Sequence, residues 1–367
     1  MLFEYEHLKN APCTFVLGAG FSVDYNPRYV PLSKNFMAIA EQNGFLDPRG
    51  RHKELVDFIR KYYGEYTDVN IESLATFLTS PLIPAREYRY DYHAKLYSDL
   101  TEIIFNTVED VHRHPASDDI RRRYQQFANF LVDVHANIIT FNYDLILDDL
   151  LGNTRYWYPP DGYGTEMRVF PESARMNSVF QAGVLKPINS EVKLFKLHGS
   201  VNWGKPLLPQ QYGPEGVFLN EGSALRPMVS LSRYEHVSHP ELEPFIVPPI
   251  LSKDQIQREP ILMNSWHRAR EALKKSRMIF VIGYSFPQTD FFFEFLIRQA
   301  TSAGWEAYSD MRDAFRQVRI VLDTIPIEYR ERVQRIFKNS DLKYDERKTA
   351  DFIRDYPAEI RKESRSS

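Results

Sequence analysis

Cysteine is nearly absent from this chain of 367 residues, which contains only Cys13. A single thiol excludes an intramolecular disulfide framework and a zinc site built from several cysteines of one chain. Strong charge of one sign is also missing, because a formal net charge of -3 does not provide the positive field that wraps nucleic acid. We therefore expect a reducing compartment and no sequence-specific contact with nucleic acid.

Long hydrophobic runs are missing too. No window approaches eighteen uncharged apolar residues, and the opening MLFEYEHLKN lacks the basic region and apolar core of a secretory signal. The length of 367 residues is enough for one large domain or two ordinary ones. The content of 43% hydrophobic and 14% aromatic residues is enough to build a core. These features predict a cytoplasmic protein that does not associate with a membrane.

Five short apolar runs are typical of buried strands. They are rich in β-branched residues, and their continuous apolar character suits a parallel sheet that is covered on both faces. The runs are TFVLG at 14–18, NIITF at 137–141, VKLFKL at 192–197, MIFVIG at 278–283 and VRIVL at 318–322. Helical patterns lie between several of them, so we predict an α/β fold with a Rossmann-like, doubly wound and mainly parallel sheet.

The stretch 51–136 differs from the rest of the chain. Its apolar residues recur every three or four positions and it contains no convincing strand, so we predict a helical insertion or lid subdomain. The main domain would then comprise 1–50 and 137–345, followed by a C-terminal tail at 346–367. Two stretches rich in Pro, Gly, Asn and Ser, 152–190 and 205–258, are predicted to be long loops.

The first apolar run ends in the turn Gly18-Ala19-Gly20, with Ser22 just beyond it. Glycines permit a positive φ or a close approach of a ligand to the main chain, and a following helix would direct partial positive charge at a phosphate. A plain glycine turn without a ligand is the alternative. The dinucleotide fingerprint GxGxxG would need glycine at Val23, which argues against an ordinary nicotinamide dehydrogenase. No GK[ST] follows the turn, which argues against a phosphate-loop NTPase.

Small polar residues follow all five runs, in the motifs GAGFS, FNYD, LHGS, GYS and LDT. Ligands of open α/β sheets bind beyond the carboxyl ends of the strands, so these motifs predict one polar rim. Asn142 is a candidate ligand-binding residue, or a helix cap or Asx-turn residue. His198 is a natural general base near neutral pH, and its alternative is a structural bond to a backbone carbonyl.

In this order, the motifs GAGFS, TFNYD, KLHGS and GYSFPQTD resemble those of the sirtuin-like superfamily, and more specifically its bacterial branch of NAD-hydrolysing domains in antiphage defence. The resemblance covers residues 13–325. It implies a Rossmann-like fold that uses NAD+ as its substrate and holds no metal. It also implies catalytic roles for Asn142 and His198, and NAD+ contacts for a further set of residues: Gly18, Ala19, Gly20, Ser22, Asp144, Ser285, Asp290 and Asp323.

The chain departs from the family pattern at two places. Zinc-dependent deacylating sirtuins contain four cysteines in a zinc module, which a single cysteine cannot supply. Relatives usually have a glycine and then a proline after the serine, whereas this chain has Asn26 and a later Pro31. Asn can adopt the left-handed conformation, so the turn can persist, but no nicotinamide-pocket residue is assigned between 23 and 34.

The reaction that the resemblance implies is cleavage of the bond between nicotinamide and C1′ of its ribose. Asn142 would hold the ribose hydroxyls, and His198 would accept a proton from a ribose hydroxyl or from the attacking water. Water as the acceptor makes the protein an NAD+ hydrolase, which is our first hypothesis. Acyl-lysine as the acceptor makes it an NAD-dependent protein deacylase, and a non-catalytic NAD-sensing or scaffold subunit is the third hypothesis.

The resemblance also implies that the activity is controlled, because a free NAD+ hydrolase would deplete its own host. Relatives often form homo-oligomers, and some act with a HerA-type ATPase or a short Argonaute protein. We therefore expect a homo-oligomer whose trigger is another defence-system protein.

Overall fold

The computed structural model describes residues 5–80, 90–158, 161–165, 168–170, 190–206, 218–220, 242–248, 256, 258–287, 290–307 and 316–366. Its central sheet is six-stranded, in the order β10-β9-β8-β1-β2-β4, and every pair of neighbours is parallel. The strands are β1 (Cys13–Leu17), β2 (Asn137–Thr140), β4 (Lys193–Lys196), β8 (Met278–Ile282), β9 (Arg316–Val321) and β10 (Ser340–Asp345).

All five apolar runs form strands of this sheet, which confirms the predicted Rossmann-like, doubly wound α/β fold. Strands β2 and β4 lie on one side of β1. The strands that come later in the chain, β8, β9 and β10, lie on the other side. This is the strand order of dinucleotide-binding folds, and β1 and β8 flank the point where the order reverses. The edge strand β10 was missed, because SDLKYD is polar and its side chains are only partly buried.

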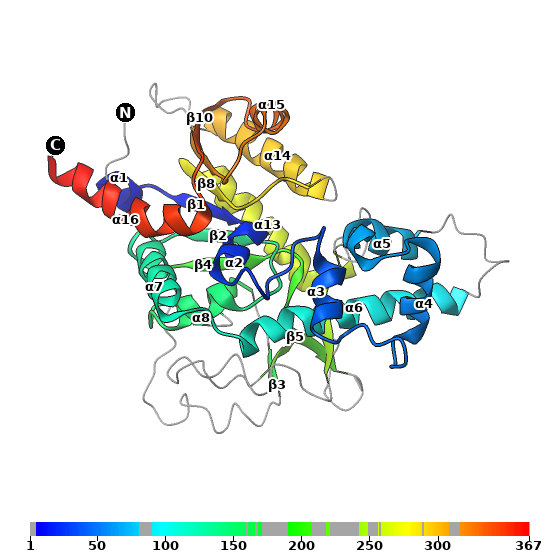
Figure 1. Ribbon diagram of the computed structural model, residues 1–367. Coiled ribbons are helices and arrows are strands. Elements are labelled where there is room, and N and C mark those ends of the chain that lie inside the picture. Colours follow the sequence, from blue (N-terminus) through cyan, green and yellow to red (C-terminus); the bar gives the residue numbers. More distant parts are fainter. Residues whose placement is uncertain are drawn as a thin grey trace.

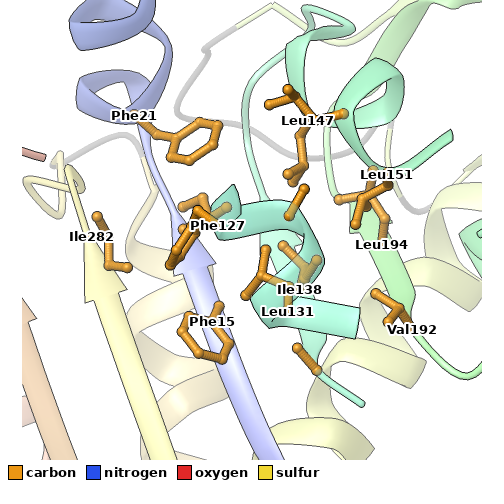
Figure 2. Close-up of a cluster of buried hydrophobic side chains, with 14 of the residues drawn as sticks. Phe15, Phe21, Phe127, Leu131, Ile138, Leu147, Leu151, Val192, Leu194 and Ile282 are labelled. Carbon is orange, nitrogen blue, oxygen red and sulfur yellow. The ribbon is translucent and has the colours of Figure 1, made fainter. Parts of the chain in front are cut away.

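Alternate side chains of β1 enter two different apolar layers. Phe15 and Leu17 join the layer that Figure 2 shows, which contains Phe127 and Leu131. Val16 joins the opposite layer. The first layer is completed by α2 (Ala19–Tyr25), α7 (Asp118–Asp133), α8 (Ile146–Gly152) and α16 (Thr349–Ser366), and the second by α13 (Pro260–Lys275), α14 (Phe291–Ala307) and α15 (Ile327–Ile336).

A second core lies outside the central sheet. It is built by α3 (Phe36–Gln42), α4 (Lys53–Tyr62), α5 (Ile71–Leu78) and α6 (Tyr90–Arg113), which Figure 1 shows grouped to one side. Helix α7 falls within the predicted insertion 51–136 but packs on the central sheet instead, where Phe127 and Phe130 meet the ring of Phe15. The helical stretch is therefore divided between two cores, because α7 presents its apolar face to β1.

A smaller sheet has the order β3-β6-β5-β7. Its strands are β3 (Arg168–Phe170), β5 (Gly199–Pro206), β6 (Phe218–Asn220) and β7 (Leu242–Ile246). Three of these strands lie in the two stretches predicted to be long loops, and they are too short to show a period in the sequence. The other residues of those stretches lie largely outside the described part of the chain.

The predicted tail at 346–367 contains a helix. Helix α16 buries Phe352, Ile353, Tyr356 and Ile360 and packs against α7 and α1 (Tyr5–Asn10). Its charged last turn concealed this apolar face in the sequence. Figure 1 shows α1 and α16, the first and last helices, side by side. Within the described ranges, no helix has both the length and the apolar character needed to cross a membrane.

Candidate active site

A pocket of about 580 Å³ lies beyond the carboxyl ends of the central strands. This volume is in the range of pockets that bind small molecules and cofactors. Asp323 is exposed, and the lining of the pocket ends one residue earlier, at Leu322. Gly18 lies directly before the lining residues of its turn. The other residues assigned from the sequence all line this one pocket: Ala19, Gly20, Ser22, Asn142, Asp144, His198, Ser285 and Asp290.

The glycine turn after β1 packs directly on the turn after β8. The Gly18 N–H donates to Ile282 O at 3.0 Å, and the Gly20 N–H donates to Gly283 O at 2.9 Å. A Cβ atom on Gly18 would lie 2.4 Å from Gly283 O, closer than atoms can approach. These glycines are needed for contact between two backbone segments, and two amides expected to face a phosphate are used within the protein.

Asn142 is fixed by hydrogen bonds from its side-chain nitrogen. Nδ2 donates to Gly18 O at 3.0 Å and to Ser22 Oγ at 2.9 Å. Because a backbone carbonyl can only accept, these bonds also identify which end of the amide is nitrogen. The carbonyl oxygen Oδ1 is then the end that can accept from a ligand hydroxyl. Asn142 does not cap helix α8, whose N-cap is Leu145.

Asp144 connects Ser22 to the start of helix α8. The Ser22 hydroxyl donates to Asp144 Oδ2 at 2.7 Å, and the Ile146 N–H donates to Asp144 Oδ1 at 3.1 Å. Burial raises the pKa of Asp144, and the positive charge of nearby Lys196 acts in the opposite direction. The carboxyl group therefore holds the loop 142–146 to the glycine turn.

His198 forms a buried pair with Asp290. Its Nε2 lies 3.7 Å from Asp290 Oδ1, and the two side chains are 3% and 6% exposed. The Tyr284 hydroxyl donates to Asp290 Oδ2 at 2.9 Å, and burial followed by the charge of Asp290 raises the pKa of Tyr284. A carboxylate beside an imidazole stabilises the imidazolium, so Asp290 favours His198 after it has accepted a proton.

Two neighbouring strands bring the catalytic candidates together. Asn142 follows β2 and His198 follows β4, and these strands pair in parallel with Thr140 opposite Lys196. The Thr140 hydroxyl donates to Leu17 O at 2.9 Å and accepts from the Asn142 N–H at 3.1 Å. The ends of β1, β2 and β4 are thus joined, and Asn142 and His198 face the same pocket.

The apolar side of the pocket was not predicted from the sequence. It is formed by the segment after α2, by the start of α3 and by helices α5 and α6. Its apolar residues include Val30, Phe36, Ile71, Ile104, Val108 and Val111. The Ser33 hydroxyl ties the first of these segments to α5 through Glu72, at 2.6 Å. The spacing of apolar residues in the sequence predicted that α6 has an apolar face. Which part of the protein this face packs against is decided by the tertiary structure.

Lys196 is a second residue that sequence reasoning missed. Its side chain is 1% exposed, and Nζ donates to Asp144 O at 2.6 Å and to Asp148 Oδ2 at 3.0 Å. The run VKLFKL contains two lysines, Lys193 and Lys196, and the sequence does not show which of them is buried. A buried charge is tolerated in a protein interior when it is paired, as Lys196 is with Asp148. Through its bond to Asp144 O, the same ammonium group also holds the loop 142–146.

The chain's single thiol, Cys13, does not line the pocket. Cys13 is buried in β1, where burial raises the pKa of its thiol to about 12. No group of three or more His, Cys, Asp or Glu side chains among the described residues is arranged to hold a metal ion.

No protein-family model and no curated protein matches this chain. Among solved structures, a Sir2 structure that addresses the mechanism and regulation of these enzymes is 12% identical, with a TM-score of 0.39 over 99% of this chain and 97% of that chain. A Sir2 mutant with a p53 peptide and NAD is also 12% identical, with a TM-score of 0.37 and the same coverage. TM-scores this low do not establish a common fold, so the Rossmann-like assignment stands on the strand order.

Proposed function

We propose that this chain is an NAD+ hydrolase that cleaves the nicotinamide–ribose bond and releases nicotinamide and ADP-ribose. The observation that carries the proposal is that Asn142 and His198 line one pocket beside the point where the strand order reverses. Dinucleotides bind beside this point in doubly wound sheets. The motif resemblance assigns the same two residues to catalysis.

The charges of the pocket are compatible with NAD+. Asp144 and Asp290 are buried carboxyl groups beside the catalytic candidates, and Glu72 is a third acidic residue in the lining. Negative charge favours a cationic pyridinium ring. Lys34, which is exposed in the same lining, supplies positive charge suited to a diphosphate.

The reaction follows from the groups that face the pocket. The oxygen of a water molecule bonds to C1′ of the ribose, and the C1′–N bond breaks with its electron pair going to the pyridinium, which leaves as neutral nicotinamide. Asn142 Oδ1 accepts from the ribose hydroxyls and holds the sugar in place. His198 takes the proton of the attacking water, and Asp290 stabilises the imidazolium that results.

The apolar wall favours a small acceptor over a protein substrate. Ile104, Val108 and Val111 recur on one side of α6 and give the pocket an apolar wall. A deacylase needs a groove that admits an extended peptide. We therefore infer that water, and not acyl-lysine, is the acceptor.

The test is incubation of the purified full chain with NAD+ while nicotinamide and ADP-ribose are quantified. The wild type should form both in equal amounts. His198→Ala should lower turnover by about 10²- to 10⁴-fold, the usual contribution of a general base. Asn142→Ala should lower it by about 10²-fold or more through loss of positioning of the ribose. Both variants should still bind nucleotide in calorimetry. Asn153→Ala and His267→Ala are matched controls at exposed positions and should retain full activity.

Two outcomes would overturn the hydrolase proposal. Formation of O-acyl-ADP-ribose from an added acyl-lysine peptide, without ADP-ribose in its absence, would establish the deacylase. Nucleotide binding without any product, alone or with candidate partner proteins, would establish the sensing or scaffold subunit.

We further propose that the enzyme is a regulated NAD-depleting effector of bacterial antiphage defence, which acts as a homo-oligomer triggered by a partner such as a HerA-type ATPase. The motif resemblance supports this role. Bacteria that express the wild type should lose NAD+ upon phage infection, and those that express Asn142→Ala should not. Unchanged NAD+ in both strains would contradict the role in defence without affecting the assay of the purified enzyme.

A further inference from the structure

Helix α6 belongs to the core of the helical insertion, and its last turn contacts the loop that holds Asn142. Leu100 and Ile103 are fully buried among the insertion helices. Further along the helix, Val108 lines the pocket. Near its end, His112 Nε2 accepts a hydrogen bond of 3.0 Å from the Leu145 N–H. One rigid element therefore joins the insertion core, the pocket wall and the loop 142–146.

The bond from Leu145 requires an unprotonated Nε2. Burial, together with the positive charge of nearby Lys196, lowers the pKa of His112 to about 3. The imidazole is therefore neutral throughout the physiological range, with its proton on Nδ1, and Nε2 remains an acceptor. Leu145 is the N-cap of α8, so the bond fixes the backbone where the loop enters that helix.

The rest of the loop 142–146 is held by the two sheets and the glycine turn. Tyr143 O accepts from the Val201 N–H at 3.0 Å, and the Tyr143 hydroxyl donates to Val247 O at 2.7 Å. Lys196 Nζ holds Asp144 O from β4. His112 differs from these partners because it comes from the insertion.

We propose that His112 is a positioning residue, which places Asn142 and Asp144 through the Leu145 N–H and so couples the geometry of the site to the position of α6. The catalytic part of this proposal rests on the proposed NAD+ hydrolase activity. A shift of α6 would move the apolar wall and the loop together, so whatever displaces the insertion also changes the alignment of Asn142. Misplacement of a catalytic group by about 1 Å can lower the rate by about 10²-fold.

The test compares His112→Ala, which removes the acceptor, with His112→Gln, whose side-chain oxygen can accept from Leu145. Ser98→Ala, at an exposed position on the same helix, is the matched control. Hydrogen exchange of the peptide containing 142–146 is measured by mass spectrometry, and kcat and KM for NAD+ are measured on the same preparations. We expect at least tenfold faster exchange and at least tenfold lower kcat in His112→Ala, with KM changed less than threefold. His112→Gln should recover most of both quantities.

Exchange in 142–146 that stays at the wild-type rate in His112→Ala would overturn the proposal. So would an unchanged kcat per folded molecule, because a merely structural role lowers the folded fraction and not the rate of each molecule. If the wild type leaves NAD+ intact, the proposed function fails, whereas the exchange measurement still decides whether His112 holds the loop.

Discussion

The polar and apolar sides of the pocket are constructed in different ways. On the polar side, Asn142 and His198 directly follow strands, and hydrogen bonds to backbone atoms fix their loops. On the apolar side, Ile104 and Val108 belong to a separate helical core and line the pocket with side chains that make only apolar contacts. Hydrogen bonds are directional and apolar contacts are not, so the polar side should tolerate change less.

The largest expected effect is a loss of stability when the buried positive charge of Lys196, next to the polar side of the pocket, is removed. Lys196→Met removes the ammonium group that pairs with Asp148 and leaves a buried carboxylate uncompensated. Breaking one partner of a buried ion pair costs about 3–5 kcal/mol. The free energy of unfolding, measured with urea, should fall by that amount.

Lys193→Met on the same strand is the control for this measurement. Its partner Asp161 is 43% exposed, so the loss should stay below about 1 kcal/mol. Equal losses of unfolding free energy in the two variants would contradict the prediction that the buried charge of Lys196 matters more for stability than the partly exposed charge of Lys193.

A somewhat smaller effect is expected where the turns after β1 and β8 touch. Gly283 has φ +62°, and a Cβ atom there would lie 2.7 Å from Phe21 N. Gly283→Ala should destabilise the protein by about 1–3 kcal/mol from backbone strain, with more from the clash, and should lower nucleotide affinity in calorimetry.

Gly152→Ala adds the same methyl group at the end of helix α8, where no atom lies within 4 Å. This variant should be neutral, or more stable by up to about 1 kcal/mol. Retained stability and affinity in Gly283→Ala would show that the polar side tolerates displacement of its backbone.

The smallest of the three effects concerns His112, which joins the two sides. Its folded-state pKa of about 3 lies below the ordinary value of 6.5, so between these pH values the unfolded chain binds a proton that the folded protein excludes. Stability should therefore fall as the pH falls from 6.5 toward 3. At pH 5 the loss from this group is about 2 kcal/mol, at about 1.36 kcal/mol for each pH unit.

His112→Gln isolates this contribution, because Asp144 has a raised pKa and its protonation changes stability with the opposite sign at acidic pH. Urea unfolding of both proteins at pH 7 and pH 5 measures the difference. Equal losses on acidification in the wild type and the variant would mean that His112 is not excluded from protonation.

The glycine turn shows which structural features a sequence motif can predict and which it cannot. The residue pattern indicated that side chains had to be small at Gly18 and Gly20, which is correct, but it suggested a phosphate as the reason. In the structure, the atoms that demand this space are those of Gly283 and Tyr284, from the turn after β8. The glycine motif indicates that another group packs closely against the turn. Which group this is depends on which strands pair in the sheet.

The amino-acid sequence by itself determined five of the six strands of the central sheet and the polar residues after them, because apolar runs that stop at glycine or polar residues are local features. Only the tertiary structure decided that α6 covers the pocket and that His112 holds Leu145, residues separated by 33 positions. It also decided that Asn142 meets Gly18 across 124 positions. Such contacts depend on how helices pack and strands order, and no short stretch of sequence contains that information.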